Sequence, residues 1–311
     1  MTESVTVQKL YEDNAKRLGL EWIAGHNGAQ RFFTKRSTVS GSPTLVGYFN
    51  LIHTNQTQVL GKTELKYIKG LRKNWLRDAC KQLFESRSVV IMITDGQYPP
   101  DRFVKLANHY EIALIRSGLS SYEILTNLRY YFTQKLADRI TLHGVFMEVL
   151  SLGVLLTGES GTGKSELALE LITRGQRLIA DDAPEFARIT PDTINGNCPS
   201  LLQDFLEVRG LGVLNIRAMY GDAAIKINKY LRLIVHLTPI LSNDGLRQDR
   251  LQIEQKMHNI LGVDIPIFSL PVAPGRNLAV LVEAAVRNHM LRLNGYNAGE
   301  DLAARQRRQM Q

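Results

Sequence analysis

The sequence predicts an α/β protein built from two domains. Short apolar runs alternate with helical spacings of apolar residues along the chain, which is typical of strands and helices packed in layers. One glycine-rich stretch, residues 158–165, stands between a predicted strand and a predicted helix. The length of 311 residues also suits two domains that each bury a core. We expect these domains to span residues 1–134 and 135–311.

Composition indicates an ordinary globular protein. Hydrophobic residues make up 44% of the chain and charged residues 22%, which are usual values for such a protein. The first residues, MTESVTVQKLYED, contain acids and no apolar core, so we see no secretory signal. The longest apolar stretch contains Glu148 and is too short to cross a bilayer. Cys80 and Cys198 lie far apart without metal-ligand spacing, which favours two reduced thiols. We therefore expect a cytoplasmic protein with no membrane partner.

The formal charge of +8 leaves two kinds of partner open. Lys and Arg could neutralise the phosphates of a nucleic acid, or the protein could be a phosphate-handling enzyme that docks an acidic partner. We find no helix-turn-helix, zinc-finger or RNA-binding signature, and aromatic residues make up only 7% of the chain. An enzyme without a nucleic-acid partner is therefore favoured.

The first domain is predicted to alternate strands and helices. We expect helices over residues 4–18, from 63 to 83, up to 110 and over 120–138, and strands over 45–52, 88–94 and 111–115. The helix from Thr63 carries a row of basic residues from Lys62 to Lys81 at three- or four-residue steps, which is either a solvated face or a docking surface. The domain contains no glycine fingerprint, metal cluster or nucleophile motif, so its role stays open.

The second domain is predicted to surround the glycine-rich stretch with strands. We expect strands over residues 141–150, 152–157, 177–180, 231–237 and 268–272, and a hairpin over 186–196. Helices are expected over residues 165–172 and from the cap Asn277 to about 292, followed by a frayed tail over 305–311.

The glycine-rich stretch GESGTGKS is a phosphate loop in its confirming context of strand, loop and helix. Its glycines let successive N–H groups point at phosphate oxygens. The lysine is placed to reach the β and γ phosphates, and the last serine can hold Mg²⁺ through its hydroxyl. A chance match in a glycine-rich turn is the alternative, which the flanks disfavour. The predicted nucleotide-binding residues are Gly158, Glu159, Ser160, Gly161, Thr162, Gly163, Lys164 and Ser165.

Two adjacent acids, Asp181 and Asp182, end a predicted strand. Because ligands of open α/β sheets gather at the carboxyl ends of strands, both acids should face the nucleotide. A phosphate-loop transferase needs a carboxylate near Mg²⁺ and a base for the acceptor hydroxyl. The two acids could share these roles, or they could be a solvated strand end. His143, on the strand before the loop, is either a hydrogen-bonded structural residue or part of the site.

Two further segments combine glycine with charged side chains. The first offers a carboxylate for a metal and a guanidinium for phosphate, unless it is only a turn between two strands. The second precedes a helix N-terminus, where free N–H groups and Arg276 suit an anion, unless it is only a rigid proline turn. The first segment is Leu206, Glu207, Val208, Arg209, Gly210, Leu211, Gly212, Val213, Leu214 and Asn215. The second is Pro271, Val272, Ala273, Pro274, Gly275 and Arg276.

Four motifs together resemble the HPr kinase/phosphorylases, which are bifunctional bacterial enzymes acting on a seryl residue of the phosphocarrier protein HPr. The motifs are GESGTGKS, RLIADD at 177–182, LEVRGLGVLN at 206–215 and PVAPGRNLAV at 271–280. They occur in the order and spacing of the family. The resemblance is strong over about residues 135–295, whereas the N-terminal part matches only in size and pattern.

The resemblance implies a fold and a set of roles. The second domain would be a phosphate-loop kinase domain resembling the nucleotide-binding core of phosphoenolpyruvate carboxykinase, in a homohexamer. The loop with Lys164 would bind the phosphates of ATP, and Ser165 and Glu207 would ligate Mg²⁺. Asp182 would take the proton of the acceptor serine. The family has further active-site residues at the positions of His143 and Arg250, and Arg247 competes for the role of Arg250.

The resemblance also implies a reverse reaction. Inorganic phosphate would attack the seryl phosphate, Asp182 would return the proton, and pyrophosphate would form. Residues 271–276 match the segment linked to this phosphorolysis, but Ala273 stands where many members carry a basic residue, so we expect one phosphate contact to be missing. The family regulates the phosphotransferase system and carbon metabolism. Two other functions stay open: a small-molecule kinase or carboxykinase relative, and a nucleotide-gated regulatory or nucleic-acid-binding module.

Overall fold

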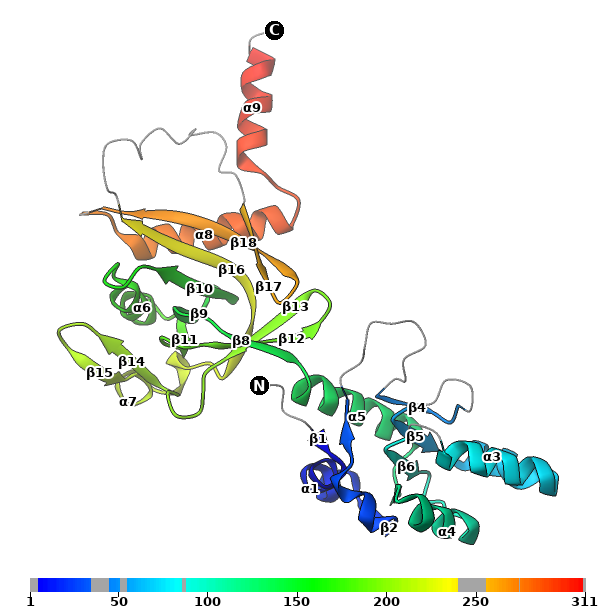
Figure 1. The fold of residues 1–311 in the computed structure, drawn as a ribbon. Coiled ribbons are helices and arrows are strands. Elements are labelled where there is room, and N and C mark those ends of the chain that lie inside the picture. Colours follow the sequence, from blue (N-terminus) through cyan, green and yellow to red (C-terminus); the bar gives the residue numbers. More distant parts are fainter. Residues whose placement is uncertain are drawn as a thin grey trace. The chain divides into compact units, whose positions relative to one another are not determined.

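The computed structural model describes residues 5–34, 45–50, 55–85, 88–239, 256–273 and 275–309. The chain divides into two compact units, Met1–Ala137 and Asp138–Gln311 (Figure 1). Each unit has its own sheet and its own buried clusters. We describe them separately.

Unit 1 contains, in its described residues, a five-stranded sheet with the order β2–β7–β6–β5–β4. Strands β4 to β7 run parallel, and β2 is antiparallel to β7. The strands are β2 (Leu20–Ala24), β4 (Val46–Tyr48), β5 (Thr57–Leu60), β6 (Val90–Ile93) and β7 (Ala113–Ser117). A separate pair is formed by β1 (Val5–Thr6) and β3 (Phe32–Phe33), and η1 (His26–Gln30) follows β2.

Helices cover both faces of this sheet, as Figure 1 shows. On one face α1 (Val7–Leu18) and α5 (Ser121–Lys135) pack against Val59 and Met92. On the other, α2 (Lys62–Gly70), α3 (Lys73–Glu85) and α4 (Asp101–Tyr110) pack against Leu60 and Ile91. Successive strand residues point to opposite faces, so the apolar run of β6 is buried throughout.

The helix bounds of unit 1 agree only in part with those predicted from local sequence signals. The capping box at Ser120 is present, since the Glu123 N–H donates to its hydroxyl and the Glu123 carboxylate accepts from its N–H. The single helix expected from 63 to 83 is wrong, because α2 ends at Gly70 and α3 begins at Lys73. Leu71 adopts an extended conformation with ψ 143° between them. The basic row is therefore divided between two helices.

Unit 2 contains a nine-stranded sheet in the part of the chain that the structure describes. Its order is β11–β9–β10–β16–β13–β12–β8, with β18 also paired to β16 and β17 paired to β18. Strands β10, β16 and β18 run parallel, so their carboxyl ends share one edge. The strands are β8 (Asp138–Thr141), β9 (Val145–Val149), β10 (Leu152–Gly158), β11 (Arg177–Ala180), β12 (Glu185–Thr190), β13 (Thr193–Asn197), β16 (Asn228–Pro239), β17 (Lys256–Ile260) and β18 (Val263–Val272).

Helices α6 (Lys164–Thr173) and α8 (Leu278–Leu293) pack on one face of this sheet around Leu171 and Val282. A small hairpin, β14 (Phe205–Val208) and β15 (Gly212–Asn215), packs beside α6 (Figure 1). It is followed by α7 (Ile216–Tyr220) and η2 (Asp222–Ala224). The opposite face forms a second cluster that includes Phe146, Phe186 and Ile234.

Two sequence-based expectations for unit 2 are wrong. The strand expected over 141–150 is broken, because Leu142 to Gly144 form a bend between β8 and β9. Gly144 has φ +150°, and a Cβ there would lie 2.3 Å from the carbonyl oxygen of Leu156, so this close approach requires glycine. The tail expected to fray is helical up to residue 309, in α9 (Ala298–Gln309).

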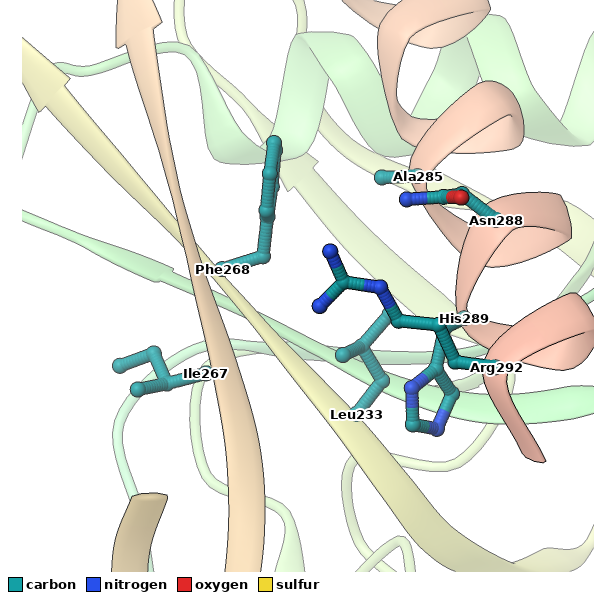
Figure 2. Close-up of a pocket in the computed structure, with 7 residues that line it drawn as sticks. All are labelled: Leu233, Ile267, Phe268, Ala285, Asn288, His289 and Arg292. Atoms are coloured by element: carbon teal, nitrogen blue, oxygen red, sulfur yellow. The ribbon is translucent and has the colours of Figure 1, made fainter. Parts of the chain in front are cut away.

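A small cavity lies between α8 and the strands β16 and β18 (Figure 2). The Arg292 side chain extends into it, and Nε of Arg292 is buried without a hydrogen-bond partner among the described residues. Burial and the charge of Arg292 lower the pKa of His289. The volume is about 30 Å³, room for roughly two waters, so this cavity cannot hold a nucleotide. It is lined by Leu233, Ile267, Phe268, Ala285, Asn288, His289 and Arg292.

Candidate active site

A cavity of about 410 Å³ opens beside the phosphate loop in unit 2. This volume is within the range of small-molecule sites. The residues that line it come from the loop, the end of β11, the bend before β9 and the β14–β15 hairpin. They are His143, Gly144, Ser160, Gly161, Gly163, Lys164, Ser165, Glu166, Asp181, Asp182, Glu207 and Arg209. The cavity thus brings together candidate residues that are up to 66 positions apart in the sequence.

The phosphate loop joins β10 to α6 in the conformation that its glycines allow. Gly161 and Gly163 have φ +83° and +85°, values that favour glycine. A Cβ on Gly158 would lie 2.7 Å from the carbonyl oxygen of Leu237. The Lys164 ammonium donates to the carbonyl oxygens of Gly158 at 3.0 Å and Glu159 at 2.9 Å. The N-terminus of α6 therefore stands open to an anion, with the lysine folded over the loop.

His143 and Asp182 meet at the mouth of the cavity. Nδ1 of His143 lies 2.9 Å from Oδ1 of Asp182, and the two side chains are 65% and 68% exposed. Asp182 has φ +63°, and its carbonyl oxygen accepts from the Gly144 N–H at 3.2 Å. The bend that breaks the expected strand thus brings the imidazole to the carboxylate. An exposed carboxylate here can be reached by a group on another protein.

Asp181 has the opposite environment. It is only 9% exposed, and its Oδ2 accepts a hydrogen bond from the backbone N–H of Glu207 at 2.8 Å. Burial raises the pKa of this carboxyl, which the hydrogen bonds from the Glu207 and Asp182 N–H groups partly offset. The two adjacent acids are therefore not equivalent.

The β14–β15 hairpin carries Glu207 and Arg209 to the cavity. Leu206 and Val208 are buried in the core, so strand alternation turns Glu207 to the opposite side. The Arg209 guanidinium lies 3.5 Å from the position of a Cβ on Gly161, which places a cation next to the phosphate loop. The segment is thus a turn between two strands and also part of the cavity wall.

Arg217 clamps the base of this hairpin. It makes a bidentate pair with Asp204, with Nε–Oδ2 at 2.6 Å and a second bond to Oδ1 at 3.0 Å. It also contacts Asp222. These hydrogen bonds raise the pKa of Arg217, so it stays charged. A bidentate pair fixes both partners in orientation as well as distance, which holds the chain entering β14.

The oxygen donors in the cavity fit Mg²⁺. No group of three or more His, Cys, Asp or Glu side chains in the described ranges is arranged to hold a metal ion. Ser165 and Glu207 nevertheless line the same cavity with a hydroxyl and a carboxylate. Mg²⁺ prefers oxygen ligands and is usually held by one or two protein groups, with phosphates and waters completing the octahedron. These two residues could therefore hold Mg²⁺ together with a nucleotide.

The described residues of the segment 271–276 are not among those that line the cavity. Residues 271–272 end β18 at the same sheet edge as the loop, since Val272 pairs with Pro239 of β16. Arg276 is exposed, and its N–H donates to the carbonyl of Ala273 at 3.3 Å. Asn277 then caps α8. Pro274, Arg247 and Arg250 lie outside the described residues.

Sequence reasoning missed one contact below the phosphate loop. Nδ1 of His236 lies 3.0 Å from Oγ1 of Thr157, the residue before the loop. The two residues are opposite each other in the parallel pairing of β10 with β16. The only sign of this contact in the sequence is a histidine, His236, inside the apolar run 231–237. Its partner Thr157 could not be predicted, because the pairing depends on the register of the two strands.

Comparison with known proteins finds similar family models and similar proteins over nearly the whole chain. Family models for the HPr serine kinase N terminus and C-terminal domain match residues 5–132 and 134–306. Proteins named HPr kinase/phosphorylase from Stenotrophomonas maltophilia and Xylella fastidiosa are each 47% identical over 306 residues, covering 98% of this chain and 97% of theirs. The solved Hpr(Ser) kinase/phosphatase from Coxiella burnetii is 33% identical, with a TM-score of 0.47, covering 52% of this chain and 98% of that one.

Proposed function

This chain belongs to the HPr serine kinase family, and from this premise we propose that it phosphorylates a seryl residue of an HPr-type phosphocarrier and removes that phosphate again by phosphorolysis. Membership of a kinase family implies the use of ATP. A fold alone does not specify chemistry. The observation that carries the proposal is one cavity that joins a phosphate loop to an exposed His143–Asp182 pair.

In the kinase direction Asp182 acts as the base. Its carboxylate accepts the proton of the seryl hydroxyl while the hydroxyl oxygen bonds to the γ phosphorus and the bond from that phosphorus to the β–γ bridging oxygen breaks. The exposure of Asp182 supports this role, because the acceptor is on another protein. His143 holds the carboxylate in position through the contact at 2.9 Å.

The cations around the cavity oppose the charge of the transferred group. Lys164 would exchange its two loop carbonyls for phosphate oxygens, and Arg209 stands next to the same loop. Fixed positive groups aimed at developing charge are the main source of rate in phosphoryl transfer. Ser165 and Glu207 would hold Mg²⁺, which when bound neutralises and aligns the phosphates.

In the reverse direction the same residues serve phosphorolysis. Asp182 returns its proton to the seryl oxygen while an oxygen of inorganic phosphate bonds to the phosphorus and the bond from that phosphorus to the seryl oxygen breaks, and the products are serine and pyrophosphate. We assign the additional anion contacts to residues 271–276, which precede the N-terminus of α8 at the same sheet edge. Arg276 is the only cation in that segment. Ala273 supplies none, so we expect weak binding of the attacking phosphate.

The remaining assignments are proposals that rest on the family resemblance alone. We propose that residues 135–311 form the catalytic domain and that residues 1–134 form a separate α/β domain whose role stays open. We also propose a homohexamer, and a role for Arg250 in the active site. Regulation of the phosphotransferase system and carbon metabolism would follow from the state of the carrier.

The test is phosphoryl transfer by the purified full chain. With Mg²⁺ and labelled ATP, we expect label on the serine of HPr and none on a carrier whose acceptor serine is replaced by alanine. Adding phosphate should then release labelled pyrophosphate. ATP binding without labelling of the carrier would contradict the kinase proposal and favour a small-molecule kinase. Release of phosphate alone would contradict phosphorolysis.

A further inference from the structure

The net positive charge of this protein resides in the unit without the phosphate loop. Residues 1–137 contain 19 Lys and Arg against 11 Asp and Glu, a formal charge of +8. Residues 138–311 contain 19 of each, so their formal charge is zero. The phosphate site therefore does not account for the charge. A net charge of this size in the unit that does not contain the phosphate loop indicates a partner of opposite charge.

The excess charge is concentrated on α2 and α3. Residues 62–85, which span both helices, contain seven cations against three acids, Glu64, Asp78 and Glu85. The Glu64 carboxylate is used internally, where it accepts from the Gly61 N–H at 2.8 Å. Asp78 lies 3.6 Å from its neighbour Arg77, and Glu85 lies 3.8 Å from Lys81. All seven cations are exposed: Lys62, Lys66, Lys69, Arg72, Lys73, Arg77 and Lys81. Their field is therefore largely uncompensated.

Most of these cations are not used to hold the fold. In the described part of the chain, ion pairs within 4.0 Å join Arg77 to Asp78 and Lys81 to Glu85, both between exposed side chains. Lys66 and Lys73 have no such partner there. Exposed ion pairs contribute little stability, so removing these charges should leave the unit folded.

Two large aromatic side chains are exposed on the same helices. Tyr67 of α2 is 62% exposed and Trp75 of α3 is 71% exposed. The inner sides of these helices are already filled by buried apolar residues, among them Leu65 and Leu83. The two rings thus add nothing to the core. Tyr, Trp and Arg are the side chains that most often anchor protein interfaces.

We propose that α2 and α3 form a docking surface for an acidic protein. The surface consists of the seven cations with Tyr67 and Trp75, and the partner would present Asp and Glu around a patch that covers the rings. A protein fits better than a nucleic acid, because the exposed rings Tyr67 and Trp75 are of the kind that anchors protein interfaces. This proposal does not depend on the proposed kinase activity.

Trp75 itself can report the binding. The chain has two tryptophans, and Trp22 packs against Tyr11 and His26 at ring-centroid distances of 5.2 and 5.4 Å. We would titrate the full chain, without nucleotide, with poly-L-glutamate of about 50 residues at low ionic strength, where charge attraction is least screened. We expect a change in tryptophan emission that is lost in Trp75→Phe and weakens with added salt. Unchanged emission on saturation would overturn the proposal.

Charge reversal with a matched control locates the surface. Lys66→Glu combined with Lys73→Glu should weaken poly-L-glutamate binding by about tenfold or more. The control, Lys16→Glu combined with Arg129→Glu, changes the net charge equally on exposed positions of α1 and α5, on the other face of the sheet, and should weaken binding by less than about twofold. Circular dichroism checks that both variants fold.

Two outcomes would contradict the assignment. Equal weakening by both double variants would mean that the net charge of the unit, and not this surface, attracts polyanions. Oligothymidylate of the same charge binding about tenfold more tightly than poly-L-glutamate at equal salt would instead identify a nucleic-acid surface.

Discussion

The buried carboxylate of Asp181 accepts a hydrogen bond from the backbone N–H of Glu207 at 2.8 Å. This contact ties the end of β11 to the hairpin that brings Glu207 to the cavity. The next residue, Asp182, lies 2.9 Å from His143 and is exposed. The two adjacent carboxylates thus have different environments, since Asp181 is buried and joins β11 to the hairpin, whereas Asp182 is exposed at the mouth of the cavity.

We predict that Asp182→Asn loses transfer in both directions while ATP still binds. General bases contribute about 10²–10⁴ to rate, and Asn keeps the shape but cannot take the proton. Transfer to and from HPr is measured by labelled phosphate, and nucleotide affinity by calorimetry. Near-normal transfer would show that another group is the base, whereas loss of ATP binding would show that the change disturbs the phosphate loop.

Asp181→Asn should change the pH dependence of stability. The unfolded chain loses the Asp181 proton near the ordinary value of about 4, but burial raises the pKa in the folded protein. Between these values the unfolded state binds fewer protons, so folding stability is lost as pH rises. Asn can accept the same hydrogen bond without titrating.

The Tm of Asp181→Asn relative to the unsubstituted protein should therefore increase from pH 4 upwards and level off above the raised pKa. Thermal unfolding at closely spaced pH values measures this difference. A difference that does not vary with pH would mean that the Asp181 carboxyl has no raised pKa.

Cys198 should be inert to thiol reagents in the folded protein. Burial, with smaller contributions from Asp204 and Asp181, raises its pKa to about 11. At pH 8 about one molecule in a thousand then carries the reactive thiolate. We expect alkylation of Cys198 at pH 8 to be slow until denaturant is added, with mass spectrometry of the labelled peptide as the readout. Fast labelling of the native protein would contradict the assigned environment.

The sequence predicted the parts of the site that are local. The phosphate loop and its flanking strand and helix are contiguous, and so is the capping box at Ser120, so spacing alone identifies them. The α/β class followed from the alternation of patterns. The sequence did not predict interruptions of strands and helices that tertiary packing imposes against the local pattern. Gly144 bends the chain because its backbone approaches Leu156 on the neighbouring strand, a contact that depends on strand register.

Contacts between residues that loops separate in the chain also could not be predicted from the sequence. Asp181 and Glu207 are 26 positions apart, and their link depends on how the hairpin folds back beside α6. The pattern at 181–182 indicated two acids at a strand end, but only burial distinguishes them. No proline lies between the end of α2 and the start of α3, and the single glycine there, Gly70, is compatible with a continuous helix. The sequence therefore did not predict that the helix ends there.

Arg217→Met should loosen the hairpin that carries Glu207. The change leaves the Asp204 carboxylate, 19% exposed, without its bidentate partner, which should lower the stability of the protein. If Glu207 holds Mg²⁺, the Mg²⁺ concentration needed for half-maximal kinase activity should rise. The matched control is Arg305→Met, which removes an exposed bidentate pair with Asp301 on α9 and should change the stability less, because exposed ion pairs contribute little. Urea unfolding and Mg²⁺ titration of both variants test this. An equal effect of the two changes would show that the clamp does not position the hairpin.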